Sequence, residues 1–480
     1  MKKSDRDGIA DPSRRRLLAG LAAAPAVASA LSACGDSSDA AGAGSTDVAP
    51  QPPPGKALPA PEDSGIDHFV IVMMENRSFD HMLGWVPGAD GLQAGLRYPD
   101  KSGASVDTFA LATEDGYGYQ ACGKEDPNHG YDGGRIHLNG GRMDGWLGTV
   151  GDAVVGSDKF PVGYFRREDL PFFAGVADQW TVCDRYFHGI LASTFPNRMY
   201  LHAGETDRRS NDFTISQLPT IWDRLAEAGR SGRYYFNDLP LTALWGAKYL
   251  TRSTHFAEFL LDAALGLLPN VSIVDPRFLG ESPNGVSNDD HPQADVRNGQ
   301  AFMNSVYNAI RQGPQWSRTL MVVVYDEWGG FYDHVAPPKA PVSASEAALP
   351  NDGRLGFRTP CMLIGPRAPK QVCKLQFDIN SVLNMLCWRF GMPTLGARGD
   401  WSLNMAYALD FDNPLRGDAP AFDVPMGPFG VECSTGLPNP LPQLPGLGVG
   451  KLSSADIRMA HHNLEWAELG ALARAHGFKV

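Results

Sequence analysis

From Ile66 onward, short apolar runs alternate with longer stretches in which apolar residues recur every three to four positions. The short runs are rich in β-branched and aromatic residues and predict strands; they are Phe69–Met74, Tyr234–Phe236, Val271–Val274, Leu320–Tyr325 and Cys361–Ile364. The longer stretches predict helices at Pro171–Gln179, Pro219–Ala228, Gly299–Arg311 and Ile379–Phe390, with a closing helix over Ala455–His476. Strands that alternate with helices indicate an α/β fold with a doubly wound, mostly parallel central sheet flanked by helices.

Apolar spacing supports the helix over Gly299–Arg311 in particular. Three of its residues fall on one helical face, namely Phe302, Val306 and Ile310. By contrast, the stretches 84–160 and 395–455 are rich in Gly and Pro and only weakly periodic. We therefore expect these stretches to be long loop insertions within one domain.

The N-terminus has the pattern of an export signal. The segment Ser13–Leu18 contains three consecutive arginines and resembles a twin-arginine motif. The Ala-rich segment Leu17–Ala33 that follows is short for a membrane span, which needs about 20 apolar residues. It ends in Leu31–Cys34, which resembles a lipobox. The pattern predicts export by the twin-arginine route and a lipidated Cys34, with cleavage without lipid as the alternative. The product would be a membrane-anchored lipoprotein in the periplasm or on the cell surface.

Residues 34–64 are mostly Ala, Gly, Ser, Asp and Pro, with almost no large apolar side chains. Such a stretch cannot bury enough apolar surface to offset the entropy of folding, so we expect a flexible tether. The predicted organisation is a signal peptide at 1–33, a tether at 34–64 and one globular domain at 65–480.

The net charge limits the kinds of molecule that the chain can bind, and the cysteine content bears on disulfide formation. The net charge is −12, and residues 1–33 carry six Lys/Arg against three Asp, so the remaining chain has a net charge of −15. This acidic balance argues against a nucleic acid partner, which requires a basic surface. Six cysteines follow Cys34 at wide spacing. An exported chain permits disulfides between them, but the connectivity stays open.

Acidic residues come directly after two predicted strands. Glu75 and Asn76 follow Phe69–Met74, and Asp326 and Glu327 follow Leu320–Tyr325. The carboxyl ends of parallel strands form the edge where open α/β sheets place their sites. Carboxylate and amide oxygens are the ligands that hard cations prefer. This pattern predicts a metal site at that edge.

A hydroxyl and two histidines complete the candidate chemistry. Thr194 lies in the segment Thr194–Arg198, where a proline fixes a turn and Asn197 begins a predicted helix. The N-terminus of a helix binds phosphate groups. His129 and His291 lie in polar loops. Each residue alone has an ordinary alternative, since acids cap helices, such a segment forms a turn and a loop histidine is solvated.

The motifs together resemble a known family. They are Glu75–His81, Asp126–His129, Asn139–Gly145, Thr194–Arg198, Asp326–Pro338 and Gly356–Pro360, in this order. The string resembles the bacterial phosphoesterase family of phospholipases C and AcpA-type acid phosphatases, whose fold is alkaline phosphatase-like. The resemblance implies that 65–480 is a phosphoesterase catalytic domain that hydrolyses phosphate esters.

The resemblance also implies roles for single residues. One divalent or trivalent metal ion would be held by a set of five: Glu75, Asn76, Asp326, Glu327 and Thr194. Thr194 would also be the nucleophile and form a phosphothreonine intermediate. His129 and His291 would contact the phosphoryl oxygens or protonate the leaving group. Asp333, His334, His81 and Asn197 would surround the site or support the structure.

Two positions depart from the expected family pattern, and they limit the metal count to one. Trp328 and Ile379 stand where we expect histidines. Whether the substrate is a phosphomonoester or a phospholipid stays open, as do two other functions. A sulfatase-like esterase would need Cys or Ser at the position of Thr194. A non-catalytic surface lipoprotein that binds phosphorylated ligands would not need an intact acidic quartet.

Overall fold

The computed structural model describes residues 54–122, 124–149, 158–279, 287–431 and 454–480, with side chains of the last segment from residue 464. These residues belong to one compact unit, Thr46–Val480. The predicted signal peptide, Cys34 and most of the predicted tether lie outside the described residues.

The unit is built around an eight-stranded sheet with the strand order β13-β6-β12-β11-β1-β10-β8-β9. The strands are β1 (His68–Met74), β6 (Thr181–Cys183), β8 (Gly232–Phe236), β9 (Ser253–His255), β10 (Val271–Val274), β11 (Thr319–Tyr325), β12 (Cys361–Ile364) and β13 (Gln371–Cys373). All pairs are parallel except those of β12, which runs antiparallel to β11 and β6. The predicted fold class and all five predicted strands are confirmed.

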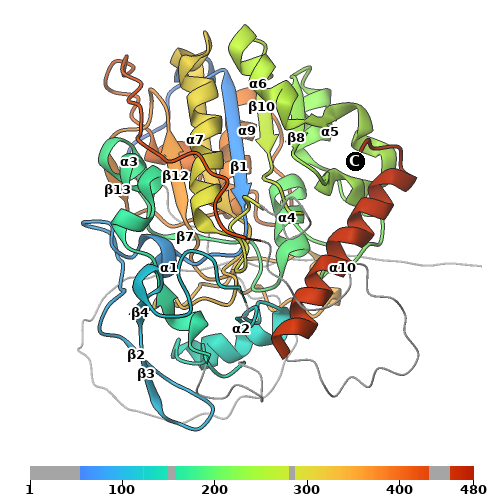
Figure 1. Cartoon of the computed structure of the whole chain (residues 1–480). Coiled ribbons are helices and arrows are strands. Elements are labelled where there is room, and N and C mark those ends of the chain that lie inside the picture. Colours follow the sequence, from blue (N-terminus) through green and yellow to red (C-terminus); the bar gives the residue numbers. More distant parts are fainter. Residues whose placement is uncertain (1–53, 123, 150–157, 280–286, 432–453) are drawn as a thin grey trace, which may run out of the picture. The chain divides into compact units, whose positions relative to one another are not determined.

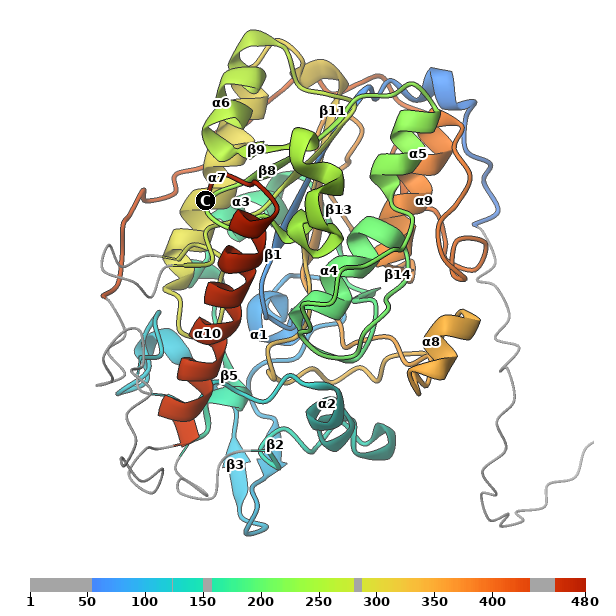
Figure 2. The same ribbon diagram turned by 90° about the vertical axis from the view of Figure 1, so that its right-hand side faces the viewer.

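Helices cover both faces of this sheet, as Figure 2 shows from the side. The helices of the described residues are α1 (Phe79–Leu83), α2 (Tyr131–Leu138), α3 (Pro171–Gln179), α4 (Thr194–Ala203), α5 (Ile221–Glu227), α6 (Phe256–Leu265), α7 (Val296–Gln312), α8 (Ala344–Ala348), α9 (Ile379–Phe390) and α10 (Ser454–Ala475). Helices α3, α6 and α7 pack together on one face, and α4, α5 and α9 pack on the other (Figures 1 and 2). The five predicted helices are confirmed to within a few residues.

Short elements accompany the main sheet. In the described residues, three two-stranded sheets join β2 (Arg97–Pro99) with β3 (Ser105–Asp107), β4 (Phe109–Ala110) with β5 (Gly163–Tyr164), and β7 (Tyr186–Phe187) with β14 (Phe377–Asp378). Of these strands, β2, β3 and β4 lie within the predicted insertion 84–160. The longest 3₁₀ segment, η7 (Leu241–Arg252), packs against α10. Loops therefore make up most of the molecule beyond the carboxyl edge of the sheet (Figure 1).

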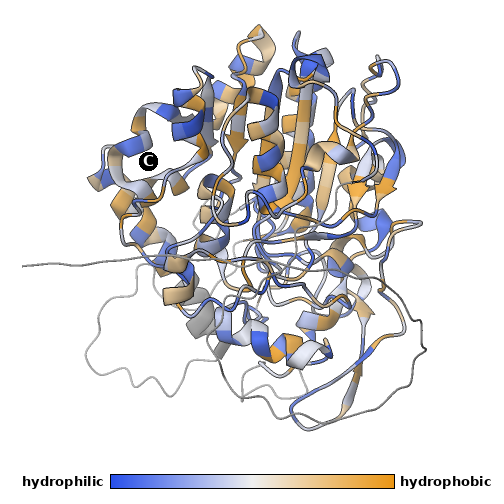
Figure 3. Cartoon of the chain, turned by 180° about the vertical axis from the view of Figure 1, so that it is seen from behind, coloured by the Kyte–Doolittle hydropathy of each residue, from blue (hydrophilic) through white to orange (hydrophobic). Residues whose placement is uncertain are grey.

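Apolar residues gather in the strands and on the inner helix faces, as the colouring of Figure 3 shows. β1 and β11 are buried along almost their whole length, because helices cover both of their faces. Phe302, Val306 and Ile310 of α7 are buried as the spacing predicts. Within the described residues, no helix is both long and apolar enough to cross a bilayer.

The cysteines of the described residues are of two kinds. Cys122 is part of a disulfide. Cys183, Cys361, Cys373 and Cys387 are buried thiols. The sequence left the disulfide pairing of the six cysteines open. In the structure, four of these six cysteines are free thiols.

Candidate active site

Two acidic pairs leave the sheet side by side. β1 and β11 are parallel neighbours, and Met74 lies opposite Tyr325 in their register. Asn76 and Asp326 are joined directly, since the backbone N–H of Asn76 donates to Asp326 Oδ1 at 3.1 Å. The side chains of Glu75, Asn76, Asp326 and Glu327 are completely buried. The quartet predicted from the sequence therefore assembles at the carboxyl edge of the sheet.

Two backbone positions with positive φ lock these pairs together. Asn76 has a φ of 61° and Gly329 a φ of 63°. A Cβ atom on Gly329 would lie 1.9 Å from the carbonyl oxygen of Asn76. Only glycine permits so close an approach of the two segments. Asn is the residue type that tolerates the left-handed region best after glycine, and such backbone strain gathers at functional sites.

Thr194 lies at the start of a helix, which corrects one sequence prediction. α4 begins at Thr194 and not at Asn197, with Ser193 as its N-cap residue. Pro196 is accommodated because N–H groups of a first turn need no helical partner. The backbone N–H of Phe195 donates to Asn211 Oδ1 at 2.9 Å. Thr194 is therefore at a helix N-terminus, where a phosphoryl group would be attracted.

Asn197 supports the segment before α4 instead of facing the site. Its Oδ1 atom accepts from the backbone N–H of Ile190 at 2.9 Å. Its Nδ2 atom donates to the carbonyls of Ile190, Ala192 and Ser193 at 2.8 to 3.0 Å. The residue fixes the turn that delivers Thr194.

Arg198 is a site residue that the sequence reasoning missed. It lies one helical turn after Thr194 and is 2 % exposed. Its guanidinium forms ion pairs with Glu75 at 3.1 Å, with Asp326 at 3.2 Å and with Asp275 at 3.1 Å. The misplaced helix start hid this residue, because a spacing of four puts two side chains on one face only if both lie in the helix.

The acidic quartet carries more negative charge than Arg198 can balance. Burial, and then the neighbouring carboxylate of Asp326, raises the pKa of Glu75 and of Glu327. Burial raises the pKa of Asp326 to about 6. In the part of the chain that the structure describes, Glu75 Oε2, Glu327 Oε1 and both side-chain polar atoms of Asn76 lack hydrogen-bond partners. Unsatisfied buried oxygens are costly, and a hard cation would satisfy them. The residues present therefore fit a metal ion.

Of the two predicted histidines, His129 lies beside this quartet and His291 lies beside His129. His129 Nε2 is 3.9 Å from Glu327 Oε1, and the rings of His129 and His291 are 6.0 Å apart. His129 Nδ1 hydrogen-bonds the carbonyl of Pro127 at 2.8 Å. This bond places the proton on Nδ1 and leaves Nε2 as an acceptor towards the site. Burial lowers the pKa of His129, which favours the neutral ring.

Asp126 is a second site residue that the sequence reasoning did not single out. Its Oδ2 atom lies 3.8 Å from His291 Nε2. Burial, and then the negative charge of Glu465, raises the pKa of Asp126 to about 8. Asp126 is the first residue of the motif that holds His129, so the signal was present but was assigned to the histidine alone.

Among the described residues, two clusters bring three potential ligand atoms within 4.8 Å of one another. One is Asp126, His129 and His291, and the other is Asp80, Asp333 and His334. The acidic quartet is not among these clusters, and the Arg198 guanidinium contacts both Glu75 and Asp326.

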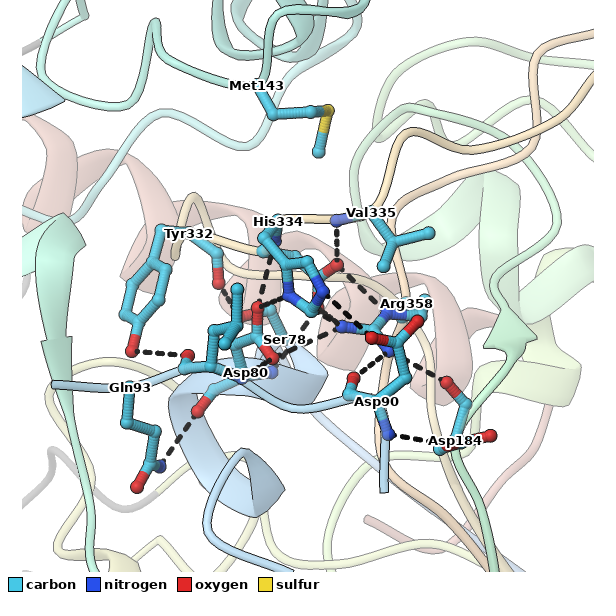
Figure 4. Close-up of polar contacts among 12 residues, drawn as sticks. Ser78, Asp80, Asp90, Gln93, Met143, Asp184, Tyr332, His334, Val335 and Arg358 are labelled. Atoms are coloured by element: carbon cyan, nitrogen blue, oxygen red, sulfur yellow. Dashed lines mark hydrogen bonds and ion pairs between the residues drawn. The ribbon is translucent and has the colours of Figure 1, made fainter. Parts of the chain in front are cut away.

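The second cluster already holds a cation, the buried guanidinium of Arg358 (Figure 4). Arg358 Nε donates to Asp333 at 3.0 Å, and Nη2 donates to Asp80 at 3.2 Å. His334 Nδ1 bonds Asp80 at 2.5 Å, and its Nε2 bonds Asp90 at 3.1 Å. The cluster ties α1, the loop after β11 and the segment before β12 together. Asp333 and His334 both take part in this ion-pair cluster.

His81 supports the loop that carries His291. Its Nδ1 hydrogen-bonds the carbonyl of Gly163 at 2.7 Å, and its Nε2 accepts from Arg77 at 2.9 Å. Arg77 in turn donates to the carbonyls of Asp290 at 2.6 Å and His291 at 3.1 Å. Burial, and then the charge of Arg77, lowers the pKa of His81. The ring is a neutral support for the Arg77 guanidinium.

The two positions that depart from the family pattern are part of the core. Trp328 is buried, donates to His137 Nδ1 at 3.2 Å and stacks on His188 at 5.4 Å. Ile379 is the buried first residue of α9, after its N-cap Asp378. Neither position offers a metal ligand.

Comparison with known proteins identifies the family. Residues 66–393 match the profile of the Phosphoesterase family. This chain belongs to the Phosphoesterase family. It is 34% identical over 329 residues to non-specific phospholipase C1 of Arabidopsis thaliana, covering 63% of this chain and 61% of that protein. It is 33% identical over 404 residues to non-specific phospholipase C4 of the same plant, covering 75% and 73%.

The match confirms the family resemblance derived from the motifs. The chain spans about three fifths of the length of the first relative, and almost three quarters of the second. A solved structure of an alkaline phosphatase superfamily protein from Vibrio parahaemolyticus aligns with 52% of this chain and 64% of its own, at 9% identity and a TM-score of 0.34.

Proposed function

We propose that this phosphoesterase hydrolyses phosphate esters of the phospholipase C type in a metal-dependent reaction that passes through a phosphothreonine. One observation carries the proposal most strongly. Buried carboxylate and amide atoms without hydrogen-bond partners gather at one edge of the sheet, and Arg198 connects them to the helix that begins with Thr194. Both curated relatives are named as phospholipases C, which favours this substrate class.

Glu75, Asn76, Asp326, Glu327 and Thr194 would hold the metal ion. When bound, a divalent or trivalent cation lowers the pKa of a coordinated hydroxyl and neutralises charge on phosphoryl oxygens. Arg198 balances part of the carboxylate charge and keeps the quartet in place. Because Arg198 is fixed in α4, it also fixes Thr194 one turn away.

The reaction proceeds in two displacements. Thr194 Oγ forms a bond to phosphorus while the bond to the leaving oxygen breaks, and water then attacks phosphorus and releases the threonine. We assign acceptance of the attacking group's proton to His129, because the bond from its Nδ1 to Pro127 leaves Nε2 as an acceptor. We assign the return of a proton to the leaving oxygen to His291, whose Nε2 lies 3.8 Å from Asp126 Oδ2.

The test is hydrolysis of p-nitrophenyl phosphate and p-nitrophenylphosphorylcholine with and without a chelator. Thr194→Ala should abolish turnover of both esters, whereas Ser193→Ala, one residue earlier, should retain it. Loss of activity in Ser193→Ala but not in Thr194→Ala would overturn the nucleophile assignment. Hydrolysis of p-nitrophenyl sulfate but of neither phosphate ester would favour the sulfatase-like alternative, and no turnover at all would favour a ligand-binding lipoprotein.

The N-terminal pattern supports a location for this activity. Export by the twin-arginine route and a lipid on Cys34 would hold the enzyme at a membrane of the periplasm or cell surface. Labelled palmitate should enter the full-length chain and be lost in Cys34→Ala. Equal labelling of both chains would exclude this anchor.

A further inference from the structure

The C-terminal helix α10 contributes to the site although it lies outside the family-matched residues 66–393. α10 is the red helix in Figures 1 and 2. Two of its consecutive residues reach the first turn of α4: Glu465 accepts a hydrogen bond from Asn211, which is bonded to Phe195, and Trp466 packs on the Phe195 ring. This contact places an additional carboxylate close to the nucleophile.

A short chain of hydrogen bonds joins Glu465 to that first turn. Asn211 Nδ2 donates to Glu465 Oε2 at 2.7 Å. Asn211 Oδ1 accepts from the backbone N–H of Phe195 at 2.9 Å. Phe195 directly follows Thr194, so only one amide group separates the carboxylate from the amide next to the nucleophile.

Trp466 fixes α10 in this position. It is 2 % exposed and stacks on Phe278 with ring centroids 4.4 Å apart and an interplanar angle of 13°. It also meets Phe195 edge-on at 6.0 Å. The guanidinium of Arg198 lies 4.8 Å from the Phe278 ring centroid. The aromatic contacts therefore continue from α10 to the residue that holds the acidic quartet.

The charge of Glu465 also reaches Asp126, a site residue outside α4. The carboxylate of Glu465 is the largest charge effect on the pKa of Asp126. Asp126 Oδ2 in turn lies 3.8 Å from His291 Nε2.

We propose that Glu465 is a specificity-determining residue that favours phosphodiesters over phosphomonoesters. A phosphomonoester carries between one and a half and two negative charges at neutral pH, about as a phosphoserine does. A phosphodiester carries one. A fixed carboxylate beside the phosphoryl site repels the second charge of the monoester and leaves the diester less affected. The inference rests on the proposed function and names the substrate class within it.

The experiment compares kcat/KM for p-nitrophenyl phosphate and p-nitrophenylphosphorylcholine in four proteins: wild type, Glu465→Gln, Glu465→Asp and Glu468→Gln. Glu465→Gln keeps an oxygen to accept from Asn211 and removes the charge. We expect it to raise the monoester-to-diester ratio of kcat/KM about tenfold, mainly through KM of the monoester. Glu465→Asp keeps the charge and should stay near the wild-type ratio. Glu468 is exposed on the same helix, so Glu468→Gln should leave the ratio unchanged.

The outcomes of this comparison separate the role proposed for Glu465 from the proposed function. An unchanged ratio in Glu465→Gln, or an equal change in Glu468→Gln, overturns this inference while leaving the proposed function intact. A lower ratio in Glu465→Gln overturns it as well, because the carboxylate would then favour the monoester. A wild-type enzyme that hydrolyses neither ester overturns the proposed function and this inference with it.

Discussion

Replacing Gly329 by alanine isolates the contact that locks the two ligand-bearing segments. Gly329 has a φ of 63°, and an added Cβ would lie 1.9 Å from the carbonyl oxygen of Asn76. Gly140 provides a matched control, because its φ is 65° and no atom lies within 4 Å of its added Cβ. Both variants adopt the left-handed backbone, but only Gly329→Ala creates a collision.

The expected magnitudes follow from these two geometries. A side chain in the left-handed region costs roughly 1–2 kcal/mol, and this is the whole expected cost of Gly140→Ala. Real Cβ atoms essentially never approach another atom within 3.0 Å, so Gly329→Ala must separate the segments by more than about 1 Å. We expect a total loss of about 4 kcal/mol in the free energy of unfolding. A shift of this size at the reacting groups should lower kcat/KM by about 100-fold.

Urea denaturation measures the loss in unfolding free energy, and hydrolysis of p-nitrophenylphosphorylcholine measures the loss in kcat/KM. Gly140→Ala should keep kcat/KM within about twofold of wild type, because its cost is purely local. The reasoning is refuted if Gly329→Ala behaves like Gly140→Ala in both assays. If both variants lose the same unfolding free energy but only Gly329→Ala loses activity, the collision distorts the site without lowering the stability of the fold further.

Three further predictions concern charge. Arg358→Lys cannot reproduce the five-donor geometry of the buried guanidinium and should lower unfolding free energy by about 3 kcal/mol; a change below about 1 kcal/mol would mean that Asp80 and Asp333 are not held as described. Burial alone would lower the pKa of His334, but its hydrogen bond to Asp80 raises it overall. The protonated ring therefore stabilises the fold below its unfolded pKa of about 6.5, and this stabilisation is lost as pH rises through the folded pKa. Denaturation midpoints should show this loss in wild type and not in His334→Gln, and identical pH profiles would contradict it. Asp326→Asn should reduce both bound metal, measured by elemental analysis, and turnover by at least about tenfold; undiminished metal content would remove Asp326 from the ligand set.

Much of the fold could be predicted from local patterns of apolar residues in the sequence. β1 and β11 are long apolar runs buried on both faces, so their sequences carry a clear signal. β6, β9 and β13 have three residues each and were not predicted. Such short strands form because neighbouring strands supply the pairing partners, which composition does not reveal.

The site was predictable to the extent that its residues share a motif or a strand end. Glu75 and Asp326 each follow a strand, so topology alone brings them together. The roles of Arg198 and Asp126 depend on where helix α4 begins and on how a loop folds back. The contribution of Glu465 depends on the packing of α10 against a turn more than 250 residues earlier. No local pattern encodes such a contact.

The most direct test of the central claim is to look for the phosphothreonine itself. The enzyme is mixed with p-nitrophenyl phosphate, quenched in acid over a time course, digested and analysed by mass spectrometry. The account predicts a phosphoryl group on Thr194 during turnover, and none in Thr194→Ala. A phosphoryl group on another residue, or turnover with no modified peptide at any time point, would contradict it.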